Sequence, residues 1–388
     1  MGKAETNKPD IMVLIDWYEP GFRGGGPIRT VANFVEACAE KYHIRVVSTA
    51  FDFGTTKPYP NVTPNTWLEG EHGERLWYFD RPQPSYRLIK ELLKEAKPDI
   101  LYLQSMFSIS FTLWPLIWHR YFSKKTRVIL APRGMFHAGA MRFSRYKKRL
   151  FLGLIQGLGL LKEARFQATD PQEKQDIKRW MGAGAEVIQA PNLPRQTQLP
   201  WNPIDKTPGE LKLVFASRVH PKKNLEFLIP LLGEISGKVS FDIYGPVEGD
   251  AYQQHLQDLA KQTAPDAILN WHGATPPVAL HQLLPQYHLS VLPTLGENFG
   301  HAVFEAWLAG VPVLISDQTP WRNLESRGIG WDLPLTDPDI WKKVLHIGVE
   351  MNDEEYKMRS KRAWEYARNQ KANPEALHQI HQLFLRPA

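Results

Sequence analysis

The sequence has little of what secreted or membrane-spanning chains need. It contains one cysteine, Cys38, so an internal disulfide is impossible, and the apolar helical pattern around it is typical of a core residue. No run reaches the roughly 18 consecutive apolar residues of a membrane span. The longest candidate, residues 107–118, predicts a buried helix. The first residues lack the apolar stretch of a signal peptide, and together these absences predict a cytoplasmic chain.

Metal-ligand patterns are also scarce. The 13 histidines show no H-x-x-x-H spacing, and the lone cysteine offers no paired ligand. His378 and His381 are three residues apart, but no third ligand is evident near them. The acidic pair Asp337 and Asp339 resembles a metal-binding pair, yet its position before the helical pattern of 340–349 favours helix capping. We therefore expect no metal site.

The charge balance is basic. The 388 residues carry a net charge of +6, with a pI of about 9.1. Such an excess favours anionic partners, namely phosphates, acidic lipid surfaces or nucleic acid, although a bias toward solubility explains it equally well. The length suits two domains better than one.

Strand-like and helical patterns alternate along the first half. Residues 11–16 form a buried-strand run that ends at a glycine-rich loop, and residues 27–41 follow with helical spacing and a proline at their start. Further strand-like runs lie at 45–49, 99–103, 127–131, 166–169 and 186–189. This alternation predicts a parallel sheet covered on both faces.

The alternation restarts after residues 191–209, whose Pro, Asn, Gln and Thr content is typical of a linker. Strand-like runs then lie at 211–216, 240–244, 268–272, 289–292 and 311–315. We expect an N-terminal domain at 1–195, a linker at 196–209, a C-terminal domain at 210–370, and a final helix at 371–388 that crosses back to the first domain. The predicted fold class is α/β, with two Rossmann-like doubly wound parallel-sheet domains that bind ligands in the cleft between them.

The segment from Glu297 to Glu305 is the most specific feature of the sequence. It joins the strand-like 289–293 to a helical pattern at 299–309, and its glycines leave backbone N–H groups free at the helix start. Such an N-terminus attracts a diphosphate. Glu305 lies two turns beyond Glu297, on roughly the same helix face, where it can accept hydrogen bonds from ribose hydroxyls. The alternative makes Glu297 a helix cap and Glu305 a solvated residue, but the apolar surroundings of Glu305 favour a ligand.

Two further loops carry residues suited to phosphate. Arg218 and Lys223 follow the first strand of the second domain, where a guanidinium fork and an ammonium can clamp a diphosphate. A basic surface turn is the alternative. The stretch Gly24-Gly25-Gly26-Pro27 follows the first strand of the chain and lets the backbone approach a ligand closely, although a flexible loop explains it equally well.

These motifs together resemble the retaining glycosyltransferases of family 4, which have the GT-B fold. The run Gly296-Glu-Asn-Phe-Gly-His-Ala-Val-Phe-Glu-Ala-Trp-Leu-Ala-Gly-Val-Pro-Val resembles the family signature almost position for position. Ala131-Pro-Arg-Gly-Met-Phe, followed by Lys147 and Lys148, resembles members that build bacterial surface polysaccharides. The resemblance covers essentially the whole chain and is strongest at 211–331.

The resemblance implies a role for each motif. Glu305 would bind the donor ribose, while Arg218 and Lys223 would hold the diphosphate as it leaves. Glu297 and the amides of three following residues would contact the donor sugar, and two glycines of the first domain would close over the phosphates. The nucleobase would rest near two residues at the end of a strand. The three amides are those of Asn298, Phe299 and Gly300. The two glycines are Gly25 and Gly26, and the residues near the nucleobase are Gly273 and Ala274.

The resemblance is less direct on the acceptor side. Many relatives carry a histidine in the first domain near the transferred sugar, whereas Gln104 and Arg133 stand near the expected places here. His137 and His301 are the candidates to replace it. The family mechanism implied is front-face attack without a metal, cofactor or dedicated base, since the departing phosphate oxygen takes the acceptor proton.

A basic stretch leads into an apolar helical pattern at 150–155, and its residues are Arg142, Arg145, Lys147, Lys148 and Arg149. This pattern suggests docking to an anionic membrane surface, at the inner face of the membrane, or to a lipid-linked diphosphate. An exposed helix with one buried face is the alternative.

The sequence therefore predicts transfer of a sugar from a nucleotide-diphosphate sugar to a hydroxyl of a glycan or lipid-linked acceptor, with no nucleic acid as partner. Two other classes stay open. One is an enzyme of the same architecture that epimerises or hydrolyses its donor, and the other is a basic protein that binds nucleic acid or membrane without catalysis. Asp52-Phe-Gly54 matches a kinase tripeptide, but no other kinase motif accompanies it.

Overall fold

The computed structural model describes residues 8–137, 141, 145–196, 199–371 and 374–385. The chain divides into two compact units, one formed by residues 1–196 with 374–388 and the other by residues 197–373. Both are layered α/β structures built on a largely parallel sheet, so the predicted fold class is confirmed.

The first unit contains an eight-stranded sheet in the order β3-β4-β2-β1-β5-β6-β7-β8. Among the named strands of the described residues, β3 and β4 pair antiparallel and the other pairs are parallel. The strands are β1 (Asp10–Leu14), β2 (His43–Thr49), β3 (Trp67–Glu69), β4 (Arg75–Phe79), β5 (Ile100–Leu103), β6 (Arg127–Leu130), β7 (Ala164–Ala168) and β8 (Val187–Gln189). β5 and, after Arg127, β6 are continuous apolar runs because both faces are covered, as in other parallel sheets, whereas β7 is fully buried but contains Arg165 and Gln167.

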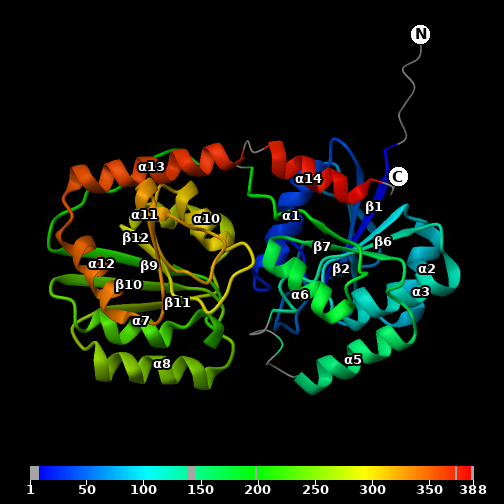
Figure 1. Ribbon diagram of the computed structural model, residues 1–388, viewed down its shortest axis with the longest axis horizontal. Helices are drawn as coiled ribbons and strands as arrows, with labels where there is room; N and C mark the ends of the chain where they lie inside the picture. The colour runs from blue at the N-terminus through cyan, green and yellow to red at the C-terminus, as the bar shows by residue number, and fades with distance from the viewer. Residues whose placement is uncertain (1–7, 138–140, 142–144, 197–198, 372–373, 386–388) are drawn as a thin grey trace, which may run out of the picture. The chain divides into compact units, whose positions relative to one another are not determined.

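The helices of this unit are α1 (Gly26–Cys38), α2 (Tyr86–Ala96), α3 (Trp114–Phe122), α5 (Arg145–Gly157), α6 (Pro171–Met181) and α14 (Pro374–Phe384) (Figure 1). The apolar run at 107–118 is not one helix, since a π-helical turn at Ile109–Leu113 precedes α3. Its core residues Phe111, Leu116 and Trp118 are nonetheless buried, as predicted.

The second unit contains a six-stranded parallel sheet in the order β11-β10-β9-β12-β13-β14. Its strands are β9 (Glu210–Ala216), β10 (Lys238–Tyr244), β11 (Ile268–Gly273), β12 (Leu289–Leu292), β13 (Val313–Ser316) and β14 (Gly330–Leu333). Its helices are α7 (Leu225–Leu232), α8 (Asp250–Thr263), α9 (Pro277–Leu283), α10 (His301–Leu308), α11 (Leu324–Arg327), α12 (Pro338–Glu350) and α13 (Asp353–Lys371).

The two faces of this sheet carry different helices. α7 packs against α8 and α12, whereas α10 packs against α13, and Figure 1 shows the two groups on opposite sides of the strands. Asp337 caps α12 by accepting a hydrogen bond from the Ile340 backbone N–H at 3.3 Å, so the predicted capping role is confirmed.

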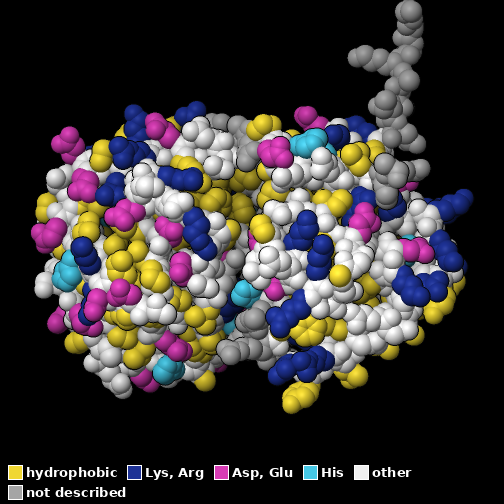
Figure 2. All heavy atoms as spheres, viewed as in Figure 1, with side chains coloured by type: hydrophobic (Ala, Val, Ile, Leu, Met, Phe, Trp, Pro, Cys, Tyr) yellow, Lys and Arg dark blue, Asp and Glu magenta, His cyan; other side chains and the backbone are white. Residues whose placement is uncertain are grey.

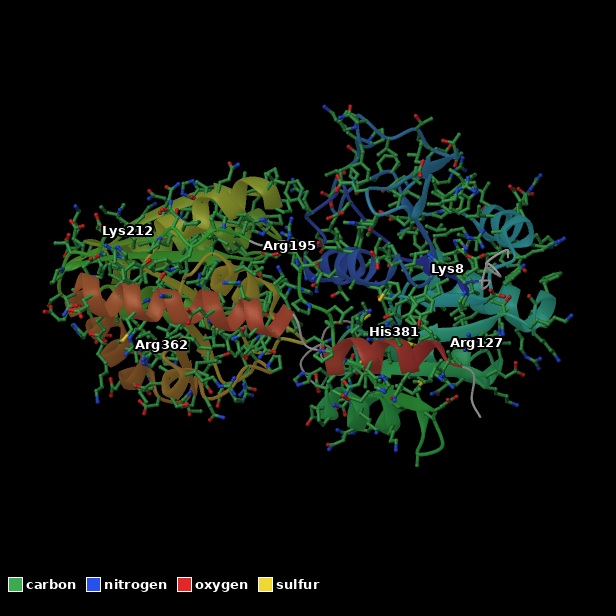
Figure 3. All side chains as sticks on the ribbon, turned by 90° about the horizontal axis from the view of Figure 1, so that it is seen from above. Lys8, Arg127, Arg195, Lys212, Arg362 and His381 are labelled. Carbon is green, nitrogen blue, oxygen red and sulfur yellow. The ribbon has the colours of Figure 1, made fainter. Side chains whose placement is uncertain are left out.

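The last helix, α14, packs into the core of the first unit. Phe384 is 3% exposed and lies 5.3 Å from the Tyr102 ring and 5.5 Å from the Phe34 ring, measured between ring centroids. The guanidinium of Arg127 on β6 donates to the Phe384 carbonyl at 2.9 Å. Figure 3, where His381 and Arg127 are labelled, shows α14 over this part of the unit.

We expect Phe384→Ala to lower the free energy of unfolding by about 3–5 kcal/mol, because it leaves a cavity beside two aromatic rings. Leu385→Ala is the matched control, since Leu385 is 60% exposed and its truncation should change stability by less than about 0.5 kcal/mol. Urea unfolding of both variants measures the difference. Equal effects would show that α14 does not contribute to the core in this way.

Candidate active site

The centre of the second sheet is its topological switch point. From β9 the chain moves to β10 and β11 on one side, and it later returns to β12, β13 and β14 on the other. β9 and β12 are neighbours, with Leu213 paired to Leu289, so their carboxyl ends lie at the same edge. Loops that leave adjacent strands toward opposite faces open a crevice there, which is where doubly wound sheets bind ligands.

The loop after β12 holds Glu297 in a fixed position. Thr294, which is fully buried, donates its hydroxyl to Glu297 Oε1 at 3.0 Å, and the Glu297 backbone N–H donates to the Gln318 carbonyl at 2.9 Å. The Ser316 hydroxyl donates to the Thr294 carbonyl at 2.5 Å. The carboxylate is therefore supported both by its own loop and by the chain that follows β13.

The loop after β9 meets this carboxylate through Lys223. Lys223 Nζ lies 2.5 Å from Glu297 Oε1, and both side chains are only 14% exposed. A backbone hydrogen bond from Leu295 N–H to the Lys222 carbonyl, at 2.8 Å, ties the two loops together beside the pair. The structure thus brings Lys223 and Glu297 into direct contact across the switch point.

This pair shifts the protonation equilibria around it. Burial opposes ionisation of Glu297, but the charges of Lys223 and Lys222 outweigh it and hold the pKa of that carboxyl below its ordinary value. Burial also lowers the pKa of Lys222, although the Glu297 carboxylate works in the opposite direction. The site keeps an ionised carboxylate beside two closely spaced ammonium groups.

Arg218 lies in the same loop after β9 as Lys223, but its partner follows the neighbouring strand β10. Its Nη1 lies 2.6 Å from Glu248 Oε1, in the loop after β10. His220 Nε2 is 3.7 Å from the other Glu248 oxygen, and burial lowers the pKa of this imidazole despite that carboxylate. Glu248 could not be predicted from the sequence, because the pairing of β9 with β10 brings it to Arg218.

A glycine makes the approach of these two loops possible. Gly245 has φ 144°, and a Cβ atom there would lie 1.9 Å from the Ser217 carbonyl oxygen. Val219 and Val247 then form a parallel bridge, with Val219 N–H donating to the Pro246 carbonyl at 2.9 Å. Only a residue without a side chain allows this contact, which carries Arg218 and Glu248 together.

The start of α10 is built around Gly300, which caps the helix in the left-handed region with φ 77°. Trp321 covers the turn, since its indole N–H donates to the Phe299 carbonyl at 2.6 Å. Because α10 begins at His301, Glu297 precedes the helix, so the prediction that Glu297 and Glu305 share a helix face is wrong. Glu305 itself is 7% exposed, which contradicts the solvated alternative.

Asn298 and Phe299 lie in the same turn, between Glu297 and the helix cap. The Phe299 ring packs against Trp321, with ring centroids 5.2 Å apart. The backbone of this turn leads directly into an eight-residue helix whose first N–H groups have no partner within the helix.

The predicted nucleobase residues lie at the end of β11. Gly273 adopts φ 69°, and its carbonyl accepts a hydrogen bond from Gly245 N–H at 2.7 Å. The neighbouring His272 ring stacks on Tyr244 with centroids 4.3 Å apart and bonds Asp242 at 2.6 Å. Ala274 follows at the carboxyl end of the strand, so this loop shares an edge of the sheet with the loops of Arg218 and Lys223.

In the first unit, the glycine-rich loop is anchored by Asp52. Its carboxylate accepts the backbone N–H groups of Phe22 at 2.9 Å and Arg23 at 3.1 Å, and its side chain is 8% exposed. Gly25 caps α1 with φ 72°, and Gly26 is the first residue of that helix. The aspartate of the kinase-like tripeptide therefore serves to hold a loop, which local sequence could not reveal.

Two predicted acceptor-side residues meet at the carboxyl ends of β5 and β6. Arg133 donates from Nε to Gln104 Oε1 at 3.0 Å, and from Nη2 to the Tyr102 hydroxyl at 2.9 Å. Its Nη1 bonds Asn192 Oδ1 at 2.5 Å. His137 lies in the next turn, where its backbone N–H donates to the Gly134 carbonyl at 3.1 Å.

The remaining replacement candidate, His301, is the first residue of α10 in the second unit. Among the described residues, the Arg133 side chain donates hydrogen bonds to Gln104, Asn192 and Tyr102. Gln104 and Arg133 are therefore in direct contact, whereas His137 and His301 lie in different units.

Neither a cluster of metal-ligating side chains nor a bilayer-spanning helix occurs among the described residues. Within those ranges, no group of three or more His, Cys, Asp or Glu side chains is arranged to hold a metal ion. None of the helices in the described part of the chain is both long and apolar enough to span a bilayer.

The model of the family "Glycosyl transferases group 1" matches residues 202–339. This stretch holds Arg218, Lys223, Glu297 and Glu305. The second unit contains a glycosyl transferases group 1 domain. No curated protein matches the sequence.

Several solved structures are similar in fold to nearly the whole chain. Sucrose-phosphate synthase from Thermosynechococcus elongatus is 16% identical, with a TM-score of 0.70 over 97% of this chain and 98% of that one. Anabaena Alr3699/HepE, in complex with UDP and glucose, is 15% identical, with a TM-score of 0.67 over 96% and 98%. S. aureus TarM, as a mutant in complex with fondaparinux, alpha-GlcNAc-glycerol and UDP, is 12% identical, with a TM-score of 0.67 over 98% and 100%. The chain has the GT-B fold.

We expect Glu297→Gln to lower the free energy of unfolding by about 3 kcal/mol at pH 7, because it leaves Lys223 buried without its counter-charge. The folded pKa of Glu297 lies below its ordinary value of 4.5, so the ionised carboxylate stabilises the fold above that pH. This contribution disappears as the pH falls through the folded pKa, and the gap between wild type and variant should narrow below about pH 4.5.

Urea unfolding between pH 3.5 and 7 measures this gap. Glu354→Gln is the control, because Glu354 is exposed on α13 and should show no pH-dependent difference. A gap that stays constant or widens in acid would contradict the pairing of Glu297 with Lys223.

Proposed function

We propose that this chain is a retaining glycosyltransferase that moves a sugar from a nucleotide-diphosphate sugar to a hydroxyl of a glycan or lipid-linked acceptor. The observation that carries the proposal is the Lys223–Glu297 pair at the switch point of a glycosyl transferases group 1 domain. A carboxylate beside buried ammonium groups, next to a helix N-terminus, suits a ligand that is partly anionic and partly rich in hydroxyls.

The anionic part of that ligand would be the diphosphate. Arg218 offers a planar fork, Lys223 offers a point charge, and the amides of Asn298, Phe299 and Gly300 begin α10. Arg218 and Lys223 now pair with Glu248 and Glu297. A diphosphate can take over these cations because it carries more negative charge than one carboxylate. Glu305 would then receive the ribose hydroxyls, with the base near Gly273 and Ala274.

The reaction breaks the bond between the anomeric carbon and the β-phosphate oxygen and forms a bond from that carbon to the acceptor oxygen on the same face. The acceptor proton passes to the departing phosphate oxygen, so no protein base is needed. Arg218 and Lys223 stabilise the charge that develops on the leaving group, which is the work a metal ion performs in other transferases. Glu297 holds the sugar hydroxyls and the Lys223 ammonium in register.

The ligands bound in the structural relatives support a nucleotide-sugar donor. Anabaena Alr3699/HepE was solved with UDP and glucose, and S. aureus TarM with UDP and glycan ligands. In the first unit, we assign Gln104 and Arg133 to acceptor recognition, with His137 beside them, and Gly25 and Gly26 to the phosphates. Synthesis of a polysaccharide or glycolipid in the cytoplasm fits these assignments.

A thermal-shift screen with UDP-, GDP-, dTDP- and ADP-sugars tests the proposal directly, since a ligand that binds only the folded chain raises its melting temperature. We expect one nucleotide class to raise it selectively. Release of free sugar or of an epimer in every acceptor mixture would instead indicate a donor hydrolase or epimerase. Salt-sensitive binding of nucleic acid that survives Glu305→Ala would indicate a binding protein.

We expect Lys223→Ala and Glu305→Ala each to reduce transfer by roughly 10²-fold or more, because they remove leaving-group stabilisation and donor positioning. The rate of nucleotide release from the donor identified by the screen provides the measurement. Lys343→Ala, an exposed position on α12, is the control and should leave the rate unchanged. Near-normal turnover in either site variant would remove the assigned site.

We also expect transfer to continue in excess EDTA, because the two cationic side chains supply the positive charge at the diphosphate. The same assay is run with EDTA and then with added Mg²⁺ or Mn²⁺. Activity that is lost with the chelator and restored by either ion would contradict the mechanism.

A further inference from the structure

The solvent-facing side of α5 in the first unit is apolar along its centre. Tyr146 is 87% exposed, Leu150 is 78% exposed and Leu154 is 50% exposed. Residues four apart lie on one helix face, so these three side chains form a single stripe. The opposite face of α5 buries Leu152 and Ile155 in the core. An ordinary surface helix has a polar outer face, and α5 reverses this pattern.

Positive charge borders the stripe on both sides. Arg145, Lys147 and Arg149 are exposed, and the helix sequence RYKKRLFLGLIQG contains no acidic residue. A helical turn of 100° per residue places Lys147 on one flank of the stripe and Arg149 on the other. Arg142, which was part of the predicted basic stretch, lies outside the described residues. Figure 2 shows Lys and Arg side chains beside hydrophobic ones over α5.

The end of α3 repeats the combination beside α5. Tyr121 is 64% exposed and Phe122 is 50% exposed, and Lys124 and Lys125 follow them. Residues 119, 120 and 124 at this end line one hollow together with residues 159, 160, 162 and 163, which come directly after α5. The end of α3, with its own exposed aromatic side chains and cations, therefore lies beside the segment that follows α5.

We propose that the outer face of α5, with the end of α3, docks on an anionic lipid bilayer. Apolar side chains at the centre of the face would enter the acyl boundary, and the flanking Lys and Arg would reach the lipid phosphates. A second copy of the chain is a poorer occupant, because pairing two such faces would bring like charges together. α5 has 13 residues, so it lies on the surface of the bilayer and does not cross it. This inference is independent of the transfer chemistry.

Cosedimentation with vesicles of phosphatidylcholine containing 30% phosphatidylglycerol, chosen as the probe, tests the proposal. We expect the full chain to bind these vesicles and not pure phosphatidylcholine, and to bind more weakly as NaCl rises. The triple variant Tyr146→Ser, Leu150→Ser, Leu154→Ser should lower the partition coefficient by at least about tenfold, as expected for lost apolar burial. The double variant Lys147→Glu, Arg149→Glu should lower it by roughly twentyfold or more, since each cation near the surface contributes about fivefold.

Two control variants distinguish the loss of the α5 face from a general loss of exposed apolar surface or of positive charge. Ile268→Ser with Val278→Ser removes two exposed apolar side chains from the other unit, at 51% and 68% exposure. Lys343→Glu with Lys361→Glu changes the net charge as much as the α5 charge variant does. Both controls should bind vesicles like the wild type, and all variants should keep the wild-type melting temperature and its shift with nucleotide sugar.

Failure of the full chain to bind anionic vesicles would overturn the proposal. So would equal losses in the α5 and control variants. A lipid-independent dimer, detected by analytical ultracentrifugation and abolished by the triple variant, would assign the face to a second copy instead. None of these outcomes depends on whether sugar transfer is found, so the docking face and the proposed function are tested separately.

Discussion

The contact between Lys223 and Glu297 is the constraint on which the second unit's site depends. It joins the loops that leave β9 and β12, the two strands at which the sheet changes direction. Without the carboxylate, the like charges of Lys222 and Lys223, which are both partly buried, would be uncompensated, with Arg218 on the same edge of the sheet. Such a cluster repels itself, and a low-dielectric environment strengthens the repulsion. Glu297 and Glu248 therefore hold the loops in shape while the chain has no ligand.

The same arrangement explains how a site can be stable and yet ready to bind. Each carboxylate neutralises part of the positive charge of its partner, Arg218 or Lys223. Under the proposed function, a diphosphate would offer more charge and more acceptor atoms than one carboxylate, so the cations could exchange partners. Thr294 and the Gln318 carbonyl keep Glu297 in place during such an exchange. Prepaired side chains also lose less conformational entropy on binding than free ones do.

The sequence predicted the parallel sheets well because buried parallel strands are continuous apolar runs, as in 11–16 and 289–292. It missed β3, β4 and β14. β3 has three residues and β14 has four, while β4 begins with the exposed Arg75, and so short or mixed a run carries little periodicity. Lys223, Glu297 and Glu305 could be selected because they lie in motifs that resemble a known family. Asp52 and Glu248 could not, since each acts on a loop about 30 residues away that only strand pairing brings near.

In the first unit, neutral hydrogen-bond partners hold Arg133 in place. It is a non-glycine residue with φ 55°, a backbone conformation that costs about 1–3 kcal/mol. Three neutral side chains, Gln104, Asn192 and Tyr102, fix its guanidinium and can offset that cost. The Glu173 carboxylate stabilises the turn by accepting a hydrogen bond from the Gly134 backbone N–H at 2.6 Å. The turn after β6 therefore presents a guanidinium with neutral side-chain partners at the carboxyl edge of the sheet, and under the proposed function this charge would favour an acceptor that carries an anionic group.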